Sequence, residues 1–227
     1  MTNYVSGPTT YDQLRWSANA FRSLADDTLC IAARAPEFRE ALQNGSADAD
    51  WPALVRYVNQ WGCRIPQSKA EGIADAVRSA MPYLEALSAS ALEFNDLRCS
   101  TLDVIEHAYD ALTSADGVGP TAASAILTAL NPQLFVSWGK GIREAYFPND
   151  KPNGATYSQF LTIMRMAALS VASDARGQHG IEDPAGRLSA VLGIEPEFSL
   201  AKFIDEYNWL TLEREMAYQE EAAMAAV

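Results

Sequence analysis

The stretch SADGVGPTAASAILTALNPQLFVSWGKGIREAY, residues 114–146, decides the fold expected for this chain. Its Gly-Val-Gly-Pro turn at 117–120 separates two segments with helical spacing of apolar residues, 102–112 and 122–130. Two glycines two residues apart permit positive φ angles and leave backbone N–H groups uncovered, and Pro120 suits the first position of a helix. The stretch therefore predicts a helical hairpin, whose turn is either an anion-binding nest of amides or a tight connection without a ligand.

The rest of the chain predicts an all-α fold. Helical patterns cover residues 11–35, 51–61, 69–87, 157–173 and 200–221, and no segment pairs with another as a β-hairpin. A polar stretch with glycines at 173–186 is expected to be a loop. We expect one compact helical unit over residues 1–227, or two intimately packed helical subdomains within it.

Composition predicts a protein of the cytoplasm that needs no metal or cofactor. The chain has 227 residues, of which 48% are hydrophobic, without an apolar run as long as a membrane span or a leading signal segment. Cys30, Cys63 and Cys99 lack CxxC spacing, and the chain has only 2 histidines. A zinc site or a disulfide framework is therefore not expected, and no glycine loop for a nucleotide cofactor is visible.

The charge distribution argues against a general binder of duplex DNA. The formal net charge is −12, whereas such a protein displaces counterions with an excess of Lys and Arg. The charge is uneven, because residues 195–227 hold eight carboxylates against two cations, while residues 56–78 carry an excess of cations. The acidic helix expected at 200–221 has an apolar stripe for packing, and a cationic face elsewhere stays possible.

The order of elements from Asp116 to Phe147 resembles the helix-hairpin-helix superfamily of DNA glycosylases. A Gly-x-Gly hairpin, a small-residue helix, Asn-Pro, a short aromatic extended run and a new helix follow one another as in that family. The resemblance is specific within the hairpin motif at 102–147, and elsewhere it rests on helix order. It implies a glycosylase-like helical bundle that binds duplex or single-stranded DNA and flips a base out of the stack. The DNA-binding residues that it implies are Gly117, Val118, Gly119, Thr121, Lys140 and Arg143.

The chain departs from the family at both catalytic positions. The register of the resemblance places the family's lysine at Thr121 and its aspartate at Gly139. Either catalysis has been lost and DNA binding kept, or other groups act, or the loop register is shifted. The candidate catalytic residues are Lys140, Glu144 and Asp116, and a shifted register adds Asp110 and Asp150.

Lys140 and Glu144 are candidates because they lie four apart on one face of the helix expected after Gly139. They are either an amine and a carboxylate at a base pocket or an exposed ion pair of little energetic weight. Gly139 and Gly141 flank Lys140, although glycine in a helix costs about 1 kcal/mol relative to alanine. These glycines indicate that a group approaches the backbone closely, as a phosphate or a modified base would.

A flipped base also needs a stacking surface. The large platforms available are Trp16, Trp51, Trp61, Trp138 and Trp209. Trp138, beside the missing aspartate, is the first candidate for the base pocket and Trp61, at the end of a helix, is the second, with burial in the core as the alternative for each. The leading hypothesis is a DNA glycosylase for a modified or damaged base, such as a hypermodified base in foreign phage DNA. The alternatives are a catalytically inert helix-hairpin-helix module that binds DNA or a protein, and a helical protein without a nucleic-acid function.

Overall fold

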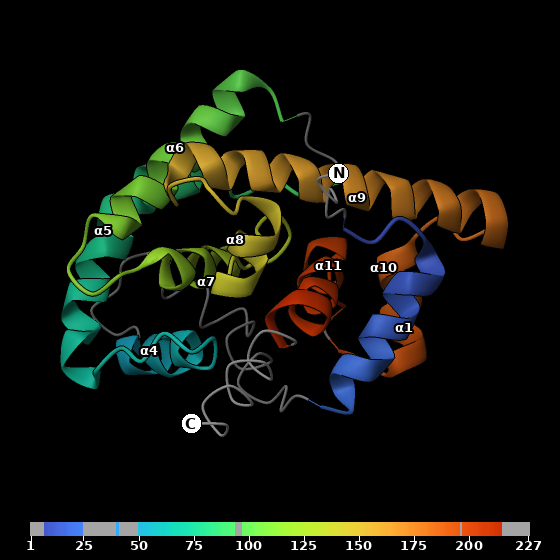
Figure 1. The fold of residues 1–227 in the computed structure, drawn as a ribbon, viewed down its shortest axis with the longest axis horizontal. Helices are drawn as coiled ribbons and strands as arrows, with labels where there is room; N and C mark the ends of the chain where they lie inside the picture. Colours follow the sequence, from blue (N-terminus) through green and yellow to red (C-terminus); the bar gives the residue numbers. More distant parts are fainter. Residues whose placement is uncertain (1–6, 25–39, 41–49, 94–96, 196, 215–227) are drawn as a thin grey trace.

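Every secondary-structure element that the structure describes is a helix. The computed structural model describes residues 7–24, 40, 50–93, 97–195 and 197–214 (Figure 1). The elements within these ranges are α1 (Tyr11–Arg22), α4 (Trp51–Asn59), the 3₁₀ helix η1 (Gln67–Lys69), α5 (Ala70–Ala86), α6 (Cys99–Thr113), α7 (Pro120–Leu130), α8 (Lys140–Tyr146), α9 (Gly154–His179), α10 (Pro184–Leu192), α11 (Leu200–Asn208) and the π-helical turn η2 (Trp209–Glu213). The all-α fold class is confirmed. No helix in these ranges has the length and apolar character needed to span a bilayer.

The helices differ in how their first turns are capped. Side-chain oxygens accept hydrogen bonds from backbone N–H groups at the starts of α1, α4, α9, α10 and α11. Such caps satisfy amides that have no partner within the helix. Helices α7 and α8 instead begin after Gly119 and Gly139, and neither glycine has a side chain to cap the helix. The two helix starts that the sequence singled out therefore lack a side-chain cap from the preceding residue, as do the starts of α5 and α6.

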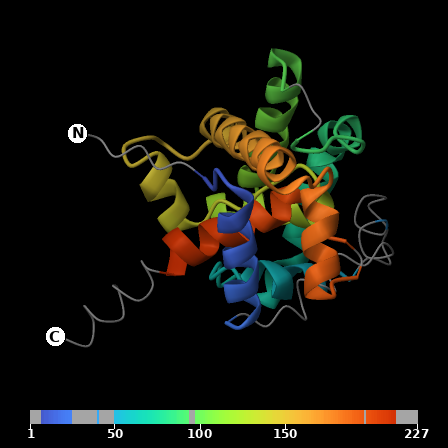
Figure 2. The ribbon, with the colours of Figure 1, turned by 90° about the vertical axis from the view of Figure 1, so that its right-hand side faces the viewer.

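The helices surround the central α7 and α8 (Figure 1). Helix α9 runs across one side and packs on α6, α5 lies along one end, and α1, α10 and α11 lie at the other end. Figure 2 shows α1 crossing α11, so that segments from opposite ends of the chain pack together. The space between α4, α8 and α11 is where the candidate site lies.

The extended run that follows α7 passes through the core. Its backbone N–H groups at Ser137 and Trp138 donate to Asp205 Oδ1 at 2.9 Å and to Ser124 Oγ at 2.8 Å. The carbonyl of Val136 accepts from the Tyr157 hydroxyl at 3.0 Å. Buried peptide groups need such partners, and here side chains of α7, α9 and α11 supply them in place of a neighbouring strand. These bonds fix the position at which α8 begins.

Helices α6 and α9 approach each other closely at Gly154. A Cβ atom at this position would lie 2.8 Å from Cα of Glu106, which belongs to α6. Asp110, one turn further along α6, accepts a hydrogen bond from the Gly154 N–H at 2.8 Å. The first residue of α9 is thus held against the α6 backbone, and Asp110 has a structural role there.

The boundaries expected from the sequence need two corrections. The loop expected at 173–186 is wrong, because α9 continues to His179 and α10 begins at Pro184. The stop is Gly180, whose φ of 64° is left-handed, whereas Gly177 lies within the helix. The helix expected at 200–221 changes to a π-helical turn at Trp209, and residues 215–221 lie outside the described ranges, as do residues 25–35 of the first expected helix.

Candidate functional site

The turn between α6 and α7 has the backbone geometry that its glycines allow. Gly117 has a φ of 87°, in the left-handed region that favours glycine, and Gly119 is extended. An added Cβ at either glycine would meet no atom within 4 Å. Val118 is only 4% exposed and anchors the turn in the core. The turn therefore presents bare backbone to the outside, next to the uncapped start of α7.

Two polar side chains beside this turn already have partners, one in an ion pair and one in a hydrogen bond. Asp116, largely exposed, pairs with Lys69 at the end of η1, which lowers the pKa of the Asp116 carboxyl through the hydrogen bond and the charge of Lys69. Thr121 Oγ1 accepts a hydrogen bond from the Arg143 guanidinium at 2.9 Å, and Arg143 also donates to the carbonyl of Trp138. Arg143 thus links the first turn of α7 to the extended run that leads into α8.

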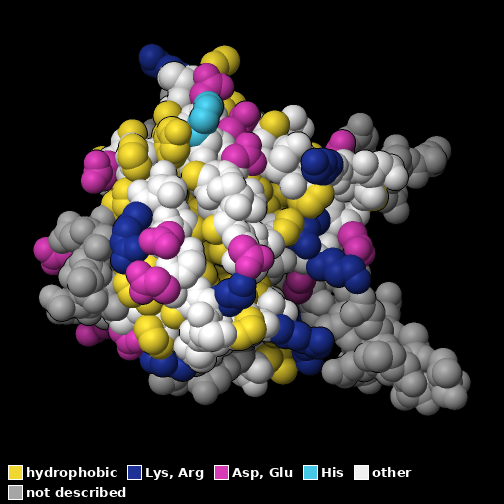
Figure 3. All heavy atoms as spheres, turned by 90° about the vertical axis from the view of Figure 1, so that its left-hand side faces the viewer, with side chains coloured by type: hydrophobic (Ala, Val, Ile, Leu, Met, Phe, Trp, Pro, Cys, Tyr) yellow, Lys and Arg dark blue, Asp and Glu magenta, His cyan; other side chains and the backbone are white. Residues whose placement is uncertain are grey.

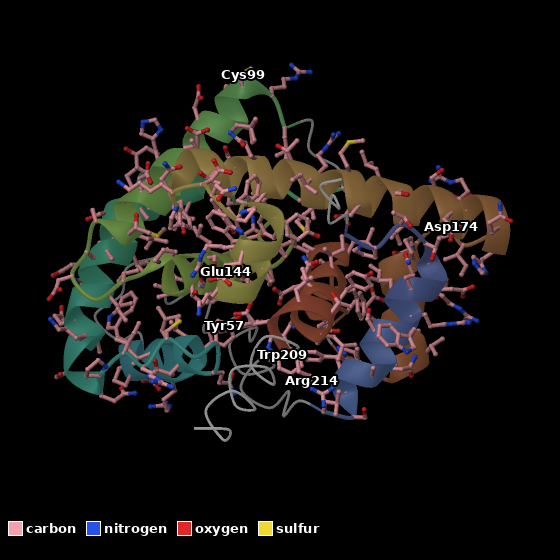
Figure 4. All side chains as sticks on the ribbon, in the orientation of Figure 1. Tyr57, Cys99, Glu144, Asp174, Trp209 and Arg214 are labelled. Carbon is pink, nitrogen blue, oxygen red and sulfur yellow. The ribbon has the colours of Figure 1, made fainter. Side chains whose placement is uncertain are left out.

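A cavity of about 280 Å³ opens at the start of α8. Its lining comes from the loop after α4, the first turn of α8 and the π-helical turn: Gln60, Trp61, Gly62, Gly139, Lys140, Gly141, Ile142, Trp209, Glu213 and Arg214. In Figure 4, the labelled Trp209 and Arg214 lie below α11, between α4 and α1. The volume is near the lower end of cavities that hold small ligands, about 300 Å³.

The loop that carries Trp61 is held by a side chain of the helix before it. The Asn59 amide donates to the Ile65 carbonyl at 2.8 Å and accepts from the Ile65 N–H at 2.6 Å. Between these residues, Gly62 has a φ of 76°, and Arg64 has a φ of 55°, which is unfavourable for a residue with a side chain. These bonds close the short loop that carries Trp61 into the lining of the cavity.

Trp209 is held by contacts with α1. Its ring meets Phe21 edge to face, with ring centroids 5.3 Å apart. The preceding helix is tied to α1 by Arg22, whose guanidinium donates to both oxygens of the buried Glu206 at 2.7 and 3.0 Å. Lys202 adds a contact to Glu206 Oε1 at 3.1 Å. A buried carboxylate with paired cations fixes this helix end because breaking the pairs would leave an uncompensated charge.

Gly139 and Gly141 are explained by Glu213. Its Oε2 accepts a hydrogen bond from the Ile142 N–H at 3.0 Å, in the first turn of α8. A Cβ at Gly139 would lie 2.7 Å from Oε2, and a Cβ at Gly141 would lie 2.9 Å from the same atom. The group that approaches the backbone closely is therefore a carboxylate of this chain, and the two glycines make room for it.

The structure brings some of the predicted site residues together and separates others. Lys140 and Trp61 line the cavity. Trp138 is fully buried, stacked on Phe160 with centroids 5.8 Å apart, and does not line it. Glu144 lies outside the lining, 4.0 Å from Lys140, with its side chain 49% exposed. Asp116 belongs to the hairpin turn and not to the cavity.

The remaining carboxylates considered for a shifted register are not in the cavity either. Asp110 binds the Gly154 N–H, and Asp150 is an exposed residue of the turn after α8. Within the described ranges, no three His, Cys, Asp or Glu residues are grouped so that they could hold a metal ion.

The sequence analysis did not identify Glu213 and Arg214 as site residues, and Trp209 was only one of the five tryptophans available as a platform. All three fall in a segment whose apolar stripe predicts a helix that packs on the domain. The sequence signal for Glu213 was indirect, because the glycines at 139 and 141 required a close neighbour whose identity is a matter of tertiary packing.

Burial makes one nearby nucleophile inactive. It raises the pKa of the Cys63 thiol to about 11, so the thiol stays protonated at neutral pH. Burial also lowers the pKa of Arg143, against the opposing effects of Tyr109 and Glu213. The polar side chains that line the cavity are those of Glu213, Lys140, Arg214 and Gln60.

The surface beside the hairpin is not a uniform basic patch. On the face shown in Figure 3, Lys and Arg side chains are interspersed with Asp and Glu side chains. On α5, Arg78 contacts Asp75 and Glu71, at 2.5 and 3.4 Å. Binding of a polyanion here would depend on local contacts more than on long-range attraction.

We compared the chain with protein-family models, with curated proteins and with solved structures, and none of them matched.

Proposed function

We propose that the chain is a DNA glycosylase-like protein that flips a modified or damaged base out of DNA and excises it. The observation that carries this proposal is the cavity at the start of α8, whose lining includes two tryptophans, Trp61 and Trp209, and the acidic residue Glu213. Indole faces stack on any base, and a carboxylate can act at the bond between base and sugar. A hypermodified base in foreign DNA belongs to the substrates that this proposal covers.

The hairpin supports the proposal because it offers a phosphate contact without a lysine. The bare backbone of Gly117 and Gly119 and the uncapped N-terminus of α7 place amides and the positive end of the helix dipole at one point. Arg143 joins this helix start, through Thr121, to the carbonyl of Trp138, which is the chain neighbour of the cavity-lining Gly139. A strand held at the hairpin would therefore pass close to the cavity.

The test is the formation of abasic sites. The protein is incubated with single-stranded and duplex oligonucleotides that contain normal bases, uracil, 8-oxoguanine, 7-methylguanine or glucosylated 5-hydroxymethylcytosine, and alkali then breaks the strand at emptied sugars. Wild-type protein is expected to produce breaks at one of the modified bases. Because base–aromatic stacking contributes about 1–3 kcal/mol, Trp209→Ala should slow release or weaken binding roughly 5- to 150-fold.

Trp16→Ala is the matched control, since Trp16 lies on α1 with 57% of its surface exposed and is not part of the cavity. Equal losses for Trp16→Ala and Trp209→Ala would remove the cavity from the proposal.

A catalytically inert DNA-binding module is the second candidate. It is favoured by Gly139 and Thr121, which stand at the positions where the resembled family has its aspartate and lysine. Binding of the same oligonucleotides without any abasic site, lost on replacement of Gly117 and Gly119 by valine in a folded protein, would favour the module.

A further inference from the structure

Glu213 is held in the cavity by a contact that uses only one of its oxygens. Oε2 accepts from the Ile142 N–H, and among the described residues Oε1 accepts no hydrogen bond. Glu213 also lines the cavity, and we expect its second oxygen to be within reach of a ligand that enters there. The carboxylate is thus positioned by backbone and still has a lone pair for a ligand.

The location of Glu213 in the chain argues against a purely structural cap. A serine or aspartate at position 139 would cap α8 locally, since Gly139 already has the extended conformation of a capping residue, with φ −65° and ψ 172°. The chain has glycine there and brings the carboxylate from the distant η2. A local cap would come from the residue before the helix, whereas Glu213 comes from η2 and lines the cavity together with Trp61 and Trp209.

The π-helical turn explains how Glu213 reaches this place. A π turn inserts one residue per turn relative to an α-helix and changes the direction of the side chains that follow it, and such turns are frequent at functional sites. Residues Trp209 and Glu213 are the first and last of this turn, and both line the cavity. One local distortion therefore places a stacking ring and a carboxylate in the same space.

We propose that Glu213 is the catalytic carboxylate of this cavity and replaces, from the far end of the chain, the carboxylate that is missing at Gly139. This inference rests on the proposed glycosylase function. In the reaction, the bond between the sugar C1′ and the base nitrogen breaks, and its electron pair leaves with the base. The Glu213 carboxylate stabilises the cationic sugar and accepts a proton from the attacking water. The oxygen of this water forms the new bond to C1′. The proton passes to the departing base, so that base and water give free base and a sugar hydroxyl.

The first test is Glu213→Gln, measured on the modified oligonucleotide that wild type cleaves, under single-turnover conditions. Glutamine keeps an oxygen that can accept the Ile142 N–H, so the fold and the cavity should be retained. Base release is expected to fall at least 100-fold, the range for loss of a charge-stabilising group or a general base, while DNA affinity changes by less than about 3-fold. The control is Glu182→Gln, a surface carboxylate paired with Arg176, which should leave release unchanged.

The second test moves the carboxylate back to α8. The atoms nearest to a Cβ at Gly139 are Cδ and both oxygens of Glu213, so Glu213→Ala vacates that space. Gly139→Asp alone should lower release because two carboxylates compete for one position. In the double variant Gly139→Asp/Glu213→Ala, release is expected to recover at least 10-fold over Glu213→Ala alone. A merely structural role of Glu213 would not produce this recovery in rate.

The outcomes separate the two proposals. Wild-type release that persists in Glu213→Gln, or that is lost in Glu144→Gln instead, overturns the role of Glu213 and leaves the glycosylase function standing. No release by wild type from any of the oligonucleotides overturns the glycosylase function, and the catalytic role of Glu213 falls with it.

Discussion

Replacing Gly139 by alanine should destabilise the protein through a side chain that is distant in sequence. The added Cβ would lie 2.5 Å from Cδ and 2.7 Å from Oε2 of Glu213, closer than atoms can pack. The backbone itself would accept alanine, because φ at Gly139 is −65°. The carboxylate of Glu213 must therefore move, and it gives up its hydrogen bond to the Ile142 N–H.

The size of the loss in stability of Gly139→Ala follows from two opposing contributions to the free energy of unfolding. A hydrogen bond to a charged group contributes about 1.5–3 kcal/mol, and the reduced freedom of the unfolded chain on Gly→Ala returns about 0.4–1 kcal/mol. The free energy of unfolding should fall by roughly 1–2 kcal/mol, a drop in Tm of about 2–8 °C for a chain of this size. Gly119→Ala is the matched control, because that Cβ meets no atom within 4 Å and the variant should be slightly more stable than wild type.

Urea denaturation of the two variants, and of a double-mutant cycle with Glu213→Ala, checks this reasoning. In the Glu213→Ala background, Gly139→Ala should no longer destabilise, which gives a coupling energy of about 1 kcal/mol or more. Additive effects, or a Gly139→Ala protein as stable as Gly119→Ala, would refute the assignment of Glu213 as the group that requires the glycine.

Three further substitutions test other features of the fold. Gly154→Ala should cost roughly 1–3 kcal/mol, because the added Cβ meets the Glu106 backbone, whereas Gly177→Ala on the same helix, with no neighbour within 4 Å, should be neutral or stabilising in thermal denaturation. Arg64→Gly should stabilise by up to about 1 kcal/mol in urea, since it relieves a φ of 55°, and a loss of stability would show that this conformation is not strained. Burial raises the pKa of Asp205 above 3.8, so the folded protein holds this proton more tightly than the unfolded chain. The contribution of this proton to stability is present at acid pH and is lost as pH rises through the raised pKa. The free energy of unfolding of wild type, relative to that of Asp205→Asn, should therefore increase as pH falls from 7 to 4. A difference between the two proteins that is constant with pH would contradict this.

Much of the local structure could be predicted from the sequence. Apolar residues at helical spacing identified α4, α5, α6 and α7 to within a few residues. The turn residues were also informative, since Gly117 has the left-handed φ and Pro120 is the first residue of α7. The misplaced end of α9 has a local cause, because Gly177 and Gly180 are both plausible stops and only the backbone conformation distinguishes them.

The candidate site was predicted only in part. Lys140 and Trp61 line the cavity, whereas Trp138, the other candidate for the base pocket, is buried among aromatic rings. A tryptophan next to a helix start has the same sequence pattern whether its ring is exposed in a pocket or buried in the core. Which of its faces is covered depends on where α9 packs, and that contact is not encoded in the neighbouring residues.

The glycines at 139 and 141 mark the division between what the sequence determined and what the tertiary structure decided. The sequence alone determined the helical segments, the hairpin turn and the requirement that something approach the start of α8, because spacing and backbone conformation are local properties. Only the tertiary structure decided that the group close to the start of α8 is Glu213, which lies on a π-helical turn. It also decided that Trp61 and Trp209 line the same cavity as Glu213. The physical reason is that close approach is a property of two surfaces, and the second surface here comes from the opposite end of the chain.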